Sequence, residues 1–444
     1  MKGAWQVSVR RFCVNLSTML ASIRTHYIDP IRSFNRAARL FLLMMLIYGL
    51  IYSGWQLFFN FYILQNGFSR DFLGLVNSLP FAAGLIGGIP LGRLSDRIGR
   101  RPALIIGFVF YSIALLMEIT FRPPILIAGS AFLSGVFNML FIISQAPLMV
   151  KLSDENNRTM LFSLNYGLQT IAGAVGSLFA GQLPAAFGTL LHISADSATA
   201  YQAVLVVTIL LGMTALIPLW LMAEPSAPRP VMPGAGLPLD LATGPASTRP
   251  AAGLTEMTLK MIAPQVLIGF GAAILIPYMN VFYKYSFNIS DSLLGILFSL
   301  SSVMIGIGTL IGPRLSTRLG GKVRALVATQ SSSLVFLFLM GFAPVLWLSA
   351  IGYLMRTALM NMASPLYSAF CMEHTPEHQQ GFVNSILNLS WNVGWAVGPF
   401  VSGVVQQAYG FAPLFIATAV LYFSAIILQW RFFDRVDHLV PVTV

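Results

Sequence analysis

Long apolar runs alternate with short polar segments along the whole chain. Twelve runs of about 20 predominantly apolar residues lie at roughly 39–64, 72–94, 103–121, 124–150, 159–183, 201–223, 260–286, 293–313, 324–343, 345–371, 381–407 and 411–430. Inside lipid a backbone must pair its own N–H and C=O groups, and a helix does this within one segment. The pattern therefore predicts an all-α integral membrane protein with twelve transmembrane helices.

Composition agrees with lipid as the main solvent. Of the 444 residues, 56% are hydrophobic and only 9% are charged, whereas a soluble domain carries about 25% charged residues. So few charges cannot cover a water-facing surface, and a soluble globular protein is excluded.

A proline-rich segment divides the twelve runs into six and six. Residues 224–256 contain seven prolines and no sustained periodicity, which is typical of a linker with little fixed structure. In chain order, the sequence predicts a basic N-terminal segment at 1–36, a six-helix bundle at 37–223, the linker at 224–256, a second six-helix bundle at 257–432 and a tail at 433–444. The N-terminal segment could form a surface amphipathic helix or a disordered basic tail, and its arginines exclude a secretory signal.

The distribution of basic residues predicts the orientation. If both termini are cytoplasmic, 22 of the 26 Lys and Arg residues lie on the cytoplasmic side, Arg70, Arg122 and Lys284 lie outside, and Arg356 lies within a helix. So steep a bias follows the positive-inside rule. It also explains the net charge of +11 through anionic lipid headgroups, without any need for nucleic acid. We expect a multi-pass protein of the cell's inner membrane.

The two halves repeat one another. "FLGLVNSL" at 72–79 matches "LLGILFSL" at 293–300, an offset of 221 residues, and the same offset places "RLSDRIG" at 93–99 on "RLSTRLG" at 314–320. Further along, Gly176 and Gly181 fall on Gly398 and Gly403. The chain is therefore a duplicated six-helix unit, the plan of many transporters whose substrate site lies between two halves.

One charged motif stands out between the second and third runs. "GRLSDRIGRR" at 92–101 resembles the loop 2–3 signature of the major facilitator superfamily, G-x-L-x-D-R-x-G-R-R. The motif, its position, the degenerate second copy and the topology together identify the chain as a member of that family. The resemblance implies two pseudo-symmetric six-helix bundles that rock about a central site, usually as a monomer.

The resemblance also implies a gate on the cytoplasmic side. Its residues are those of the first motif with a neighbouring loop pair, namely Gly92, Asp96, Arg97, Gly99, Arg100, Arg101, Glu155 and Arg158, and the second-half counterparts Arg314, Arg318 and Gly320. Thr317 replaces the aspartate in the second copy, so we expect an asymmetric latch. The alternative is that the basic cluster only fixes topology and that the Glu155–Arg158 pair is a solvated loop pair.

The family architecture implies that helices 1, 4, 7 and 10 line the cavity. Arg356 is the only basic residue near the centre of a run, and a charge at that depth is costly enough to indicate function. It could bind a carboxylate or phosphate, or it could bridge helices. The other substrate candidates are Tyr52, Trp55, Gln56, Asn138, Gln145, Tyr278, Asn280 and Asn361; each could instead be packing.

Coupling to an ion has a weaker signal. Glu118 is the sole acid within a run and lies near the outer end of the third helix, so it is the candidate for proton coupling. The antiporter signature expected in helix 5 is incomplete there, because Ser177 occupies its proline position.

These observations predict a secondary active transporter for a small organic solute, anionic or amphiphilic, that works by rocker-switch alternating access. Multidrug efflux by proton antiport is one alternative, and a non-transporting membrane receptor or scaffold on the same fold is another. Neither a nucleophile–base set nor a metal-ligand spacing is present, and His374 and His378 flank Pro376. We therefore expect no enzymatic activity, no metal and no cofactor.

Overall fold

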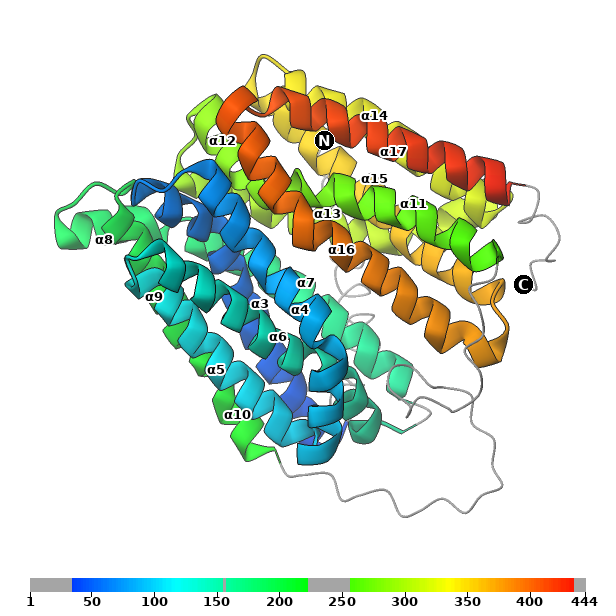
Figure 1. The fold of residues 1–444 in the computed structure, drawn as a ribbon, viewed down its shortest axis with the longest axis horizontal. Coiled ribbons are helices and arrows are strands. Elements are labelled where there is room, and N and C mark those ends of the chain that lie inside the picture. Colours follow the sequence, from blue (N-terminus) through cyan, green and yellow to red (C-terminus); the bar gives the residue numbers. More distant parts are fainter. Residues whose placement is uncertain (1–33, 155–156, 223–255, 435–444) are drawn as a thin grey trace, which may run out of the picture.

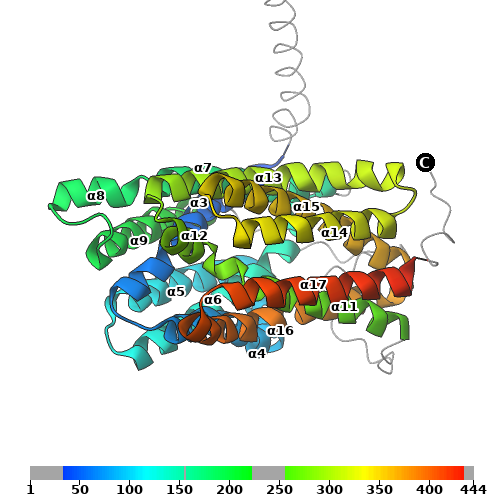
Figure 2. The same ribbon diagram turned by 90° about the horizontal axis from the view of Figure 1, so that it is seen from above.

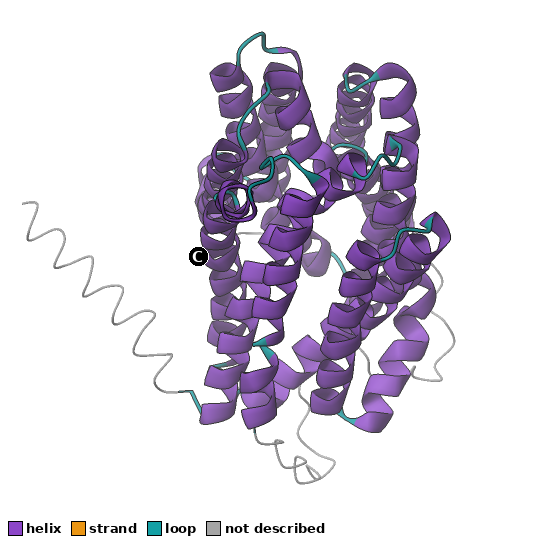
Figure 3. Ribbon diagram, turned by 90° about the vertical axis from the view of Figure 1, so that its left-hand side faces the viewer, coloured by secondary structure: helices purple, strands orange, loops and turns teal. Residues whose placement is uncertain are grey.

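The structure is a computed structural model that describes residues 34–154, 157–222 and 256–434. These residues form helices and no strand (Figure 3). Most of the predicted segments 1–36, 224–256 and 433–444, and Glu155 of the predicted gate, lie outside the described residues.

The first bundle begins with a helix capped by Asn35, whose side chain accepts a hydrogen bond from the backbone N–H of Ala38. Its helices are α3 (Arg36–Gln65), α4 (Arg70–Ile98), α5 (Arg100–Thr120), α6 (Pro124–Leu152), α7 (Arg158–Ala180), α8 (Leu183–Leu191), α9 (Ala198–Met213) and α10 (Leu216–Leu221). The predicted fifth run divides at Gly181, and α8 restarts with Pro184 in its first turn. Proline is favoured there because the first N–H groups of a helix lack intrahelical partners.

The second bundle repeats this arrangement. Its helices are α11 (Glu256–Ala273), the 3₁₀ turn η2 (Ile276–Tyr278), α12 (Met279–Phe287), α13 (Asp291–Arg318), α14 (Lys322–Phe342), α15 (Leu346–Glu373), α16 (Glu377–Tyr409) and α17 (Ala412–Phe433). The predicted seventh run is interrupted at η2 because Pro277 cannot donate a helical hydrogen bond.

Twelve membrane-crossing helices are accounted for. Ten helical segments of the described residues are long and apolar enough to cross a membrane, and α15 and α16, which carry more polar side chains, complete the set. Figure 1 shows the two bundles side by side, with α4 of the first against α16 of the second. In Figure 2, α7 and α13 form the second line of contact.

Glycines related by the repeat build both lines of contact between the bundles. A Cβ added to Gly74 on α4 would lie 3.1 Å from the Cα of Gly403 on α16, and one added to Gly295 on α13 would lie 2.8 Å from the Cα of Gly181. Gly74 corresponds to Gly295 and Gly181 to Gly403 in the duplicated sequence. Such small-residue contacts let backbones approach closely, so the repeat in sequence is a pseudo-symmetry in structure.

A second pair of repeat-related glycines packs each bundle internally. Gly176 of α7 lies against Leu50 and Ser53 of α3, and Gly398 of α16 lies against Ala273 of α11. The glycines that recur at every fourth residue of α4 pack less closely: Gly84 and Gly88 face Met139, whereas a Cβ on Gly92 would meet open space.

The two ends of the molecule differ. We call the end that carries the connections 66–69, 192–197, 288–290 and 410–411 the latch end, and the end that carries 99, 153–157, 319–321 and 374–376 the motif end. In the described residues, the hydrogen bonds and ion pairs that join the two bundles all run through the latch-end half, as in Asn60–Asn280, Arg70–Gln406 and Asp196–Lys284. The bundles are thus held together at one end only.

Candidate functional site

A cavity of about 500 Å³ lies between the bundles and extends into the second one. Its first-bundle wall comes from α3 and α7, through Tyr52, Ser53, Gln56, Gly173 and Ser177. Residues of α11, η2, α13, α14, α15, α16 and α17 supply the rest. The volume is in the range of cavities that hold a small organic molecule.

Among the described residues that line this cavity, Arg356 is the one that carries a charge. Its side chain is 4% exposed, and its Nη2 donates a hydrogen bond of 2.7 Å to the hydroxyl of Tyr422 on α17. The guanidinium carbon also lies 5.6 Å from the centre of the Tyr422 ring, within the range of a cation–π interaction. Its Nε is buried without a hydrogen-bond partner among the described residues, so the guanidinium keeps donor capacity beside the cavity.

Three other sequence candidates also line the cavity: Tyr52, Gln56 and Asn361. Gln56 donates a hydrogen bond from Nε2 to the hydroxyl of Tyr52 at 2.6 Å, and Asn361 donates one to the backbone carbonyl of Thr357 at 2.8 Å. These residues give the cavity neutral polar groups beside aromatic surface.

Helix 4 does not contribute as expected. The cavity takes no residue from α6, so Asn138 and Gln145 lie away from it. Tyr48 of α3 fills the intervening space: its hydroxyl donates to Asn138 Oδ1 at 3.4 Å, and its ring centre is 5.0 Å from that of Phe141. Aromatic side chains packed between α3 and α6 therefore separate α6, the fourth predicted helix, from the cavity.

Trp55, Tyr278 and Asn280 also lie outside the cavity lining. Trp55 stacks on Phe59 with ring centres 4.4 Å apart. The hydroxyl of Tyr278 donates to the backbone carbonyl of Pro399 at 2.8 Å and is fully buried. Asn280 donates to the carbonyl of Leu57 at 2.8 Å and accepts from Asn60 at 2.9 Å. Because the helix is broken before α12, Tyr278 packs against α16 and Asn280 joins the second bundle to α3 of the first.

Polar side chains that the sequence reasoning missed complete the cavity wall. Gln330 of α14 and Gln429 of α17 line it and are 4% and 0% exposed. Their signal in the sequence was a glutamine within each of two long apolar runs, at "LVATQSSSL" in the run 324–343 and at "AIILQW" in the run 411–430. It was missed because helices 9 and 12 were not among the helices expected to face the cavity.

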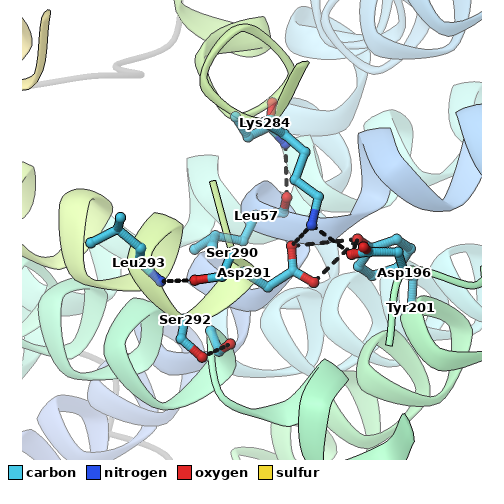
Figure 4. Close-up of polar contacts among 10 residues, drawn as sticks. Leu57, Asp196, Tyr201, Lys284, Ser290, Asp291, Ser292 and Leu293 are labelled. Carbon is cyan, nitrogen blue, oxygen red and sulfur yellow. Dashed lines mark hydrogen bonds and ion pairs between the residues drawn. The ribbon is translucent and has the colours of Figure 1, made fainter. Parts of the chain in front are cut away.

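A partly buried charge cluster joins the bundles at the latch end (Figure 4). Lys284 Nζ on α12 lies 2.6 Å from Asp196 Oδ1 of the first bundle and 2.7 Å from Asp291 Oδ1 of the second. The hydroxyl of Tyr201 on α9 adds hydrogen bonds of 3.0 Å to Asp196 and 3.2 Å to Asp291. Asp291 is 6% exposed, so it depends on these partners.

Asp196, which lies in the connection before α9, is held ionised by this cluster. Partial burial opposes ionisation of its carboxyl, but the hydrogen bond and charge of Lys284 outweigh this, and the pKa of Asp196 falls below its usual value. In the sequence, Lys284 was recognised only as one of three basic residues on the outer side of the membrane. Its signal was a lysine seven positions before an aspartate, both beside apolar runs.

The motif residues cluster at the motif end. Asp96 forms an ion pair with Arg100, and Arg100 also donates to Ser95 Oγ at 2.9 Å. Arg101 donates to the carbonyl of Trp220 at 2.8 Å, at the end of α10, where a positive charge stabilises a helix terminus. Gly99 has φ of +93°, the left-handed region that glycine tolerates.

The remaining gate residues have simple surroundings. Arg97, Arg314 and Arg318 are exposed, and Gly320 adopts φ of +73°, as its counterpart Gly99 leads one to expect. Arg158 begins α7, and its Nε is buried without a hydrogen-bond partner among the described residues.

Glu118 lies two residues before the end of α5, near the latch end. It is 2% exposed, and its Oε1 has no hydrogen-bond partner among the described residues. It does not line the central cavity. Any proton that it binds would act on the cavity through the packing of the first bundle.

A family comparison decides the relationship that this geometry suggests. The family model described as Major Facilitator Superfamily matches residues 41–265 and 262–442. The chain belongs to the Major Facilitator Superfamily. Membership agrees with the two pseudo-symmetric bundles, the motif at 92–101 and the cavity between the bundles, and it makes this chain a transporter by family.

Sequence relatives of this superfamily member include proteins described as multidrug resistance protein MdtG. The protein of Rahnella sp. (strain Y9602) is 28% identical over 152 residues, which cover 34% of this chain and 35% of the relative. The protein of Salmonella paratyphi B (strain ATCC BAA-1250 / SPB7) is 26% identical over 184 residues, 40% and 44% of the two chains. The chain thus matches less than half the length of these curated relatives.

Solved structures show the same superfamily fold. An inward-facing, occupied bacterial homologue of the human lysosomal transporter Spinster superposes with a TM-score of 0.73 at 15% identity, covering 91% of this chain and 98% of the other. The human organic anion transporter MFSD10 (TETRAN) gives a TM-score of 0.61 at 16% identity, covering 89% and 99%.

Proposed function

We propose that this protein is a secondary active transporter that moves a small organic anion across the membrane by rocker-switch alternating access. The observation that carries the proposal is the charge of the cavity: Arg356 is its one charged lining residue, and no carboxylate of the lining balances it. A buried cation without a counter-charge favours an anionic ligand. The aromatic and amide side chains around it suit an organic body.

The one-sided closure supports the mechanism. The bundles are bonded across the latch end, and the pseudo-symmetric glycine contacts allow one bundle to rock against the other. In the proposed cycle the latch end opens when the Lys284 cluster separates, while Asp96 and its arginines close the motif end.

The proposed orientation follows the basic residues. The motif end carries most of them, so we place it, both termini and the linker in the cytoplasm, with the latch end outside a cell's inner membrane. The conformation is then inward-facing. We further propose a monomer, with Glu118 as the site of a coupling proton.

A screen of ligand-induced thermal stabilisation tests the substrate class. Purified wild-type protein and Arg356→Leu are compared against organic anions, cations and neutral compounds, since a ligand of the folded state raises its stability by RT ln(1 + [L]/Kd). Anions that stabilise the wild type but not the variant support the proposal. Lipophilic cations that stabilise both equally would contradict it.

Multidrug efflux by proton antiport is the second candidate. Relatives named as multidrug resistance proteins and the buried acid Glu118 favour it. Equal stabilisation of the wild type and Arg356→Leu by lipophilic cations in the screen would support it. Absence of solute counterflow in vesicles, with any compound of the screen, would leave the receptor or scaffold alternative.

A further inference from the structure

Buried polar atoms without partners gather on one wall of the cavity. In the part of the chain that the structure describes, nine buried side-chain nitrogen or oxygen atoms lack a hydrogen-bond partner. Four of them belong to three cavity-lining residues: Arg356 Nε, Gln330 Oε1, and Gln429 Oε1 and Nε2. These three come from neighbouring helices of the second bundle, α15, α14 and α17.

Polar groups elsewhere in the lining are paired. Ser53 donates to the carbonyl of Leu50 at 2.7 Å, Gln56 donates to Tyr52 at 2.6 Å, and Asn361 donates to Thr357 at 2.8 Å. Unpaired buried polar groups are costly and rare, so their concentration on the wall formed by α14, α15 and α17 marks a place where a ligand supplies the missing partners. Gln429 lies seven residues after Tyr422, the partner of Arg356, on α17, which places it about 10 Å along the wall from the guanidinium.

The chemistry of the unpaired atoms restricts that ligand. Arginine only donates hydrogen bonds, whereas a glutamine amide has one accepting oxygen and one donating nitrogen, whichever way it is turned. A carboxylate or phosphate accepts from Arg356 and from an amide nitrogen. It cannot satisfy the amide oxygens of Gln330 and Gln429, which need an O–H or N–H donor.

We propose that Arg356, Gln330, Gln429 and Tyr422 form a recess that binds the polar groups of the transported solute, an organic anion with a hydroxyl or N–H donor several bonds away from its acidic group. This rests on the proposed function and specifies its substrate class. Arg356 holds the anionic group, and the two glutamines select for the remote donor. The wall of Tyr52 and Gln56 faces the rest of the solute.

Two probes that differ by a single hydroxyl test the recess. Binding of hexanoate and of 6-hydroxyhexanoate to the purified full chain is measured by calorimetry for wild type, Gln330→Met, Gln429→Met and Gln406→Met. Gln406 is a matched control, because it is 2% exposed, also has an unpaired Oε1, and lies outside the cavity lining. A group that must be hydrogen-bonded typically discriminates by about tenfold or more.

We expect wild type and Gln406→Met to bind 6-hydroxyhexanoate about tenfold more tightly than hexanoate. Gln330→Met and Gln429→Met should lose this preference and still bind hexanoate. Equal affinities in the wild type, or a preference that survives in both cavity variants, would overturn the recess while leaving the anion proposal standing. If neither anion binds the wild type, or if Arg356→Gln binds both unchanged, the proposed function fails and the recess with it. The wild-type comparison decides the matter even if a glutamine variant does not fold.

Discussion

The Nζ atom of Lys284 in the second bundle lies 2.6 Å from Oδ1 of Asp196 in the first bundle and 2.7 Å from Oδ1 of Asp291 in its own bundle. Together with Tyr201, these residues form the latch, a charged connection between the bundles beside the glycine contact of Gly181 and Gly295. Because Asp291 and Lys284 are nearly buried, the latch is sensitive to loss of either partner.

Replacing Lys284 by Met should open the latch end. The change leaves Asp291 buried without its cation, which typically costs about 3–5 kcal/mol, and outward opening relieves this by hydrating the carboxylate. Spin labels at Ile125→Cys and Tyr409→Cys, both exposed residues of the latch end, report the separation of the bundles in a background without Cys13 and Cys371. A longer-distance population should appear.

Lys260→Met is the matched control. Lys260 pairs with Glu256 one turn away on the same helix, and such exposed pairs contribute little. Its distance distribution should equal that of the wild type. If Lys284→Met also leaves the distribution unchanged, the cluster is not a latch.

Titration of Asp196 should not open the latch in the physiological range. The pKa of Asp196 is below its usual value of about 4, so its contribution is fully present above that value and is lost as the pH falls through the lowered pKa. Opening that depends on Asp196 should therefore appear in the distance between the same two labels only below about pH 4. Opening between pH 5 and pH 7 would show that another group controls the latch.

Adding bulk at Gly74 should prevent closure of the latch end. A Cβ there would lie 2.6 Å from the carbonyl oxygen of Pro399, and overpacking of this kind typically costs about 1–3 kcal/mol. Gly74→Val should therefore shift the label distance upward and slow transport. Gly129→Val, where the added Cβ meets nothing within 4 Å, should behave as wild type; equal effects of the two variants would rule out the contact as the cause.

Glu118 should matter for energy coupling and not for solute binding. Glutamine keeps its shape but cannot exchange a proton, so Glu118→Gln should reduce transport driven by a pH gradient by about tenfold or more while counterflow at equal pH continues. Glu373→Gln, at a half-exposed residue paired with Lys322, serves as the control. Full gradient-driven transport by Glu118→Gln would exclude it as the coupling site.

The sequence predicted the helices and the duplication because both depend on local composition and on repeated residues. Gly74 and Gly295 were found as members of a repeat before their contacts were known. Side-chain direction was harder to predict. Asn280 was taken for a cavity residue, but the chain break at Pro277 turns it toward Asn60.

The cavity was also predicted only in part. Arg356 was found because a charge in an apolar run is conspicuous, and Tyr52, Gln56 and Asn361 were found with it. Gln330 and Gln429 are equally polar interruptions, yet they lie on helices that were not among those expected to line the cavity. Only the three-dimensional packing of α14 against both α15 and α17 shows that their side chains reach the cavity wall.

Counterflow in proteoliposomes tests the central claim most directly. Vesicles containing wild type, Arg356→Lys or Arg356→Leu are preloaded with the unlabelled organic anion that stabilises the wild type most, and uptake of the labelled anion is followed. We expect robust uptake by the wild type, reduced uptake by Arg356→Lys because lysine lacks the planar fork, and at least about tenfold less by Arg356→Leu. Equal uptake by wild type and Arg356→Leu would show that the buried arginine does not hold the solute, and the account of this protein as an organic-anion transporter would fail.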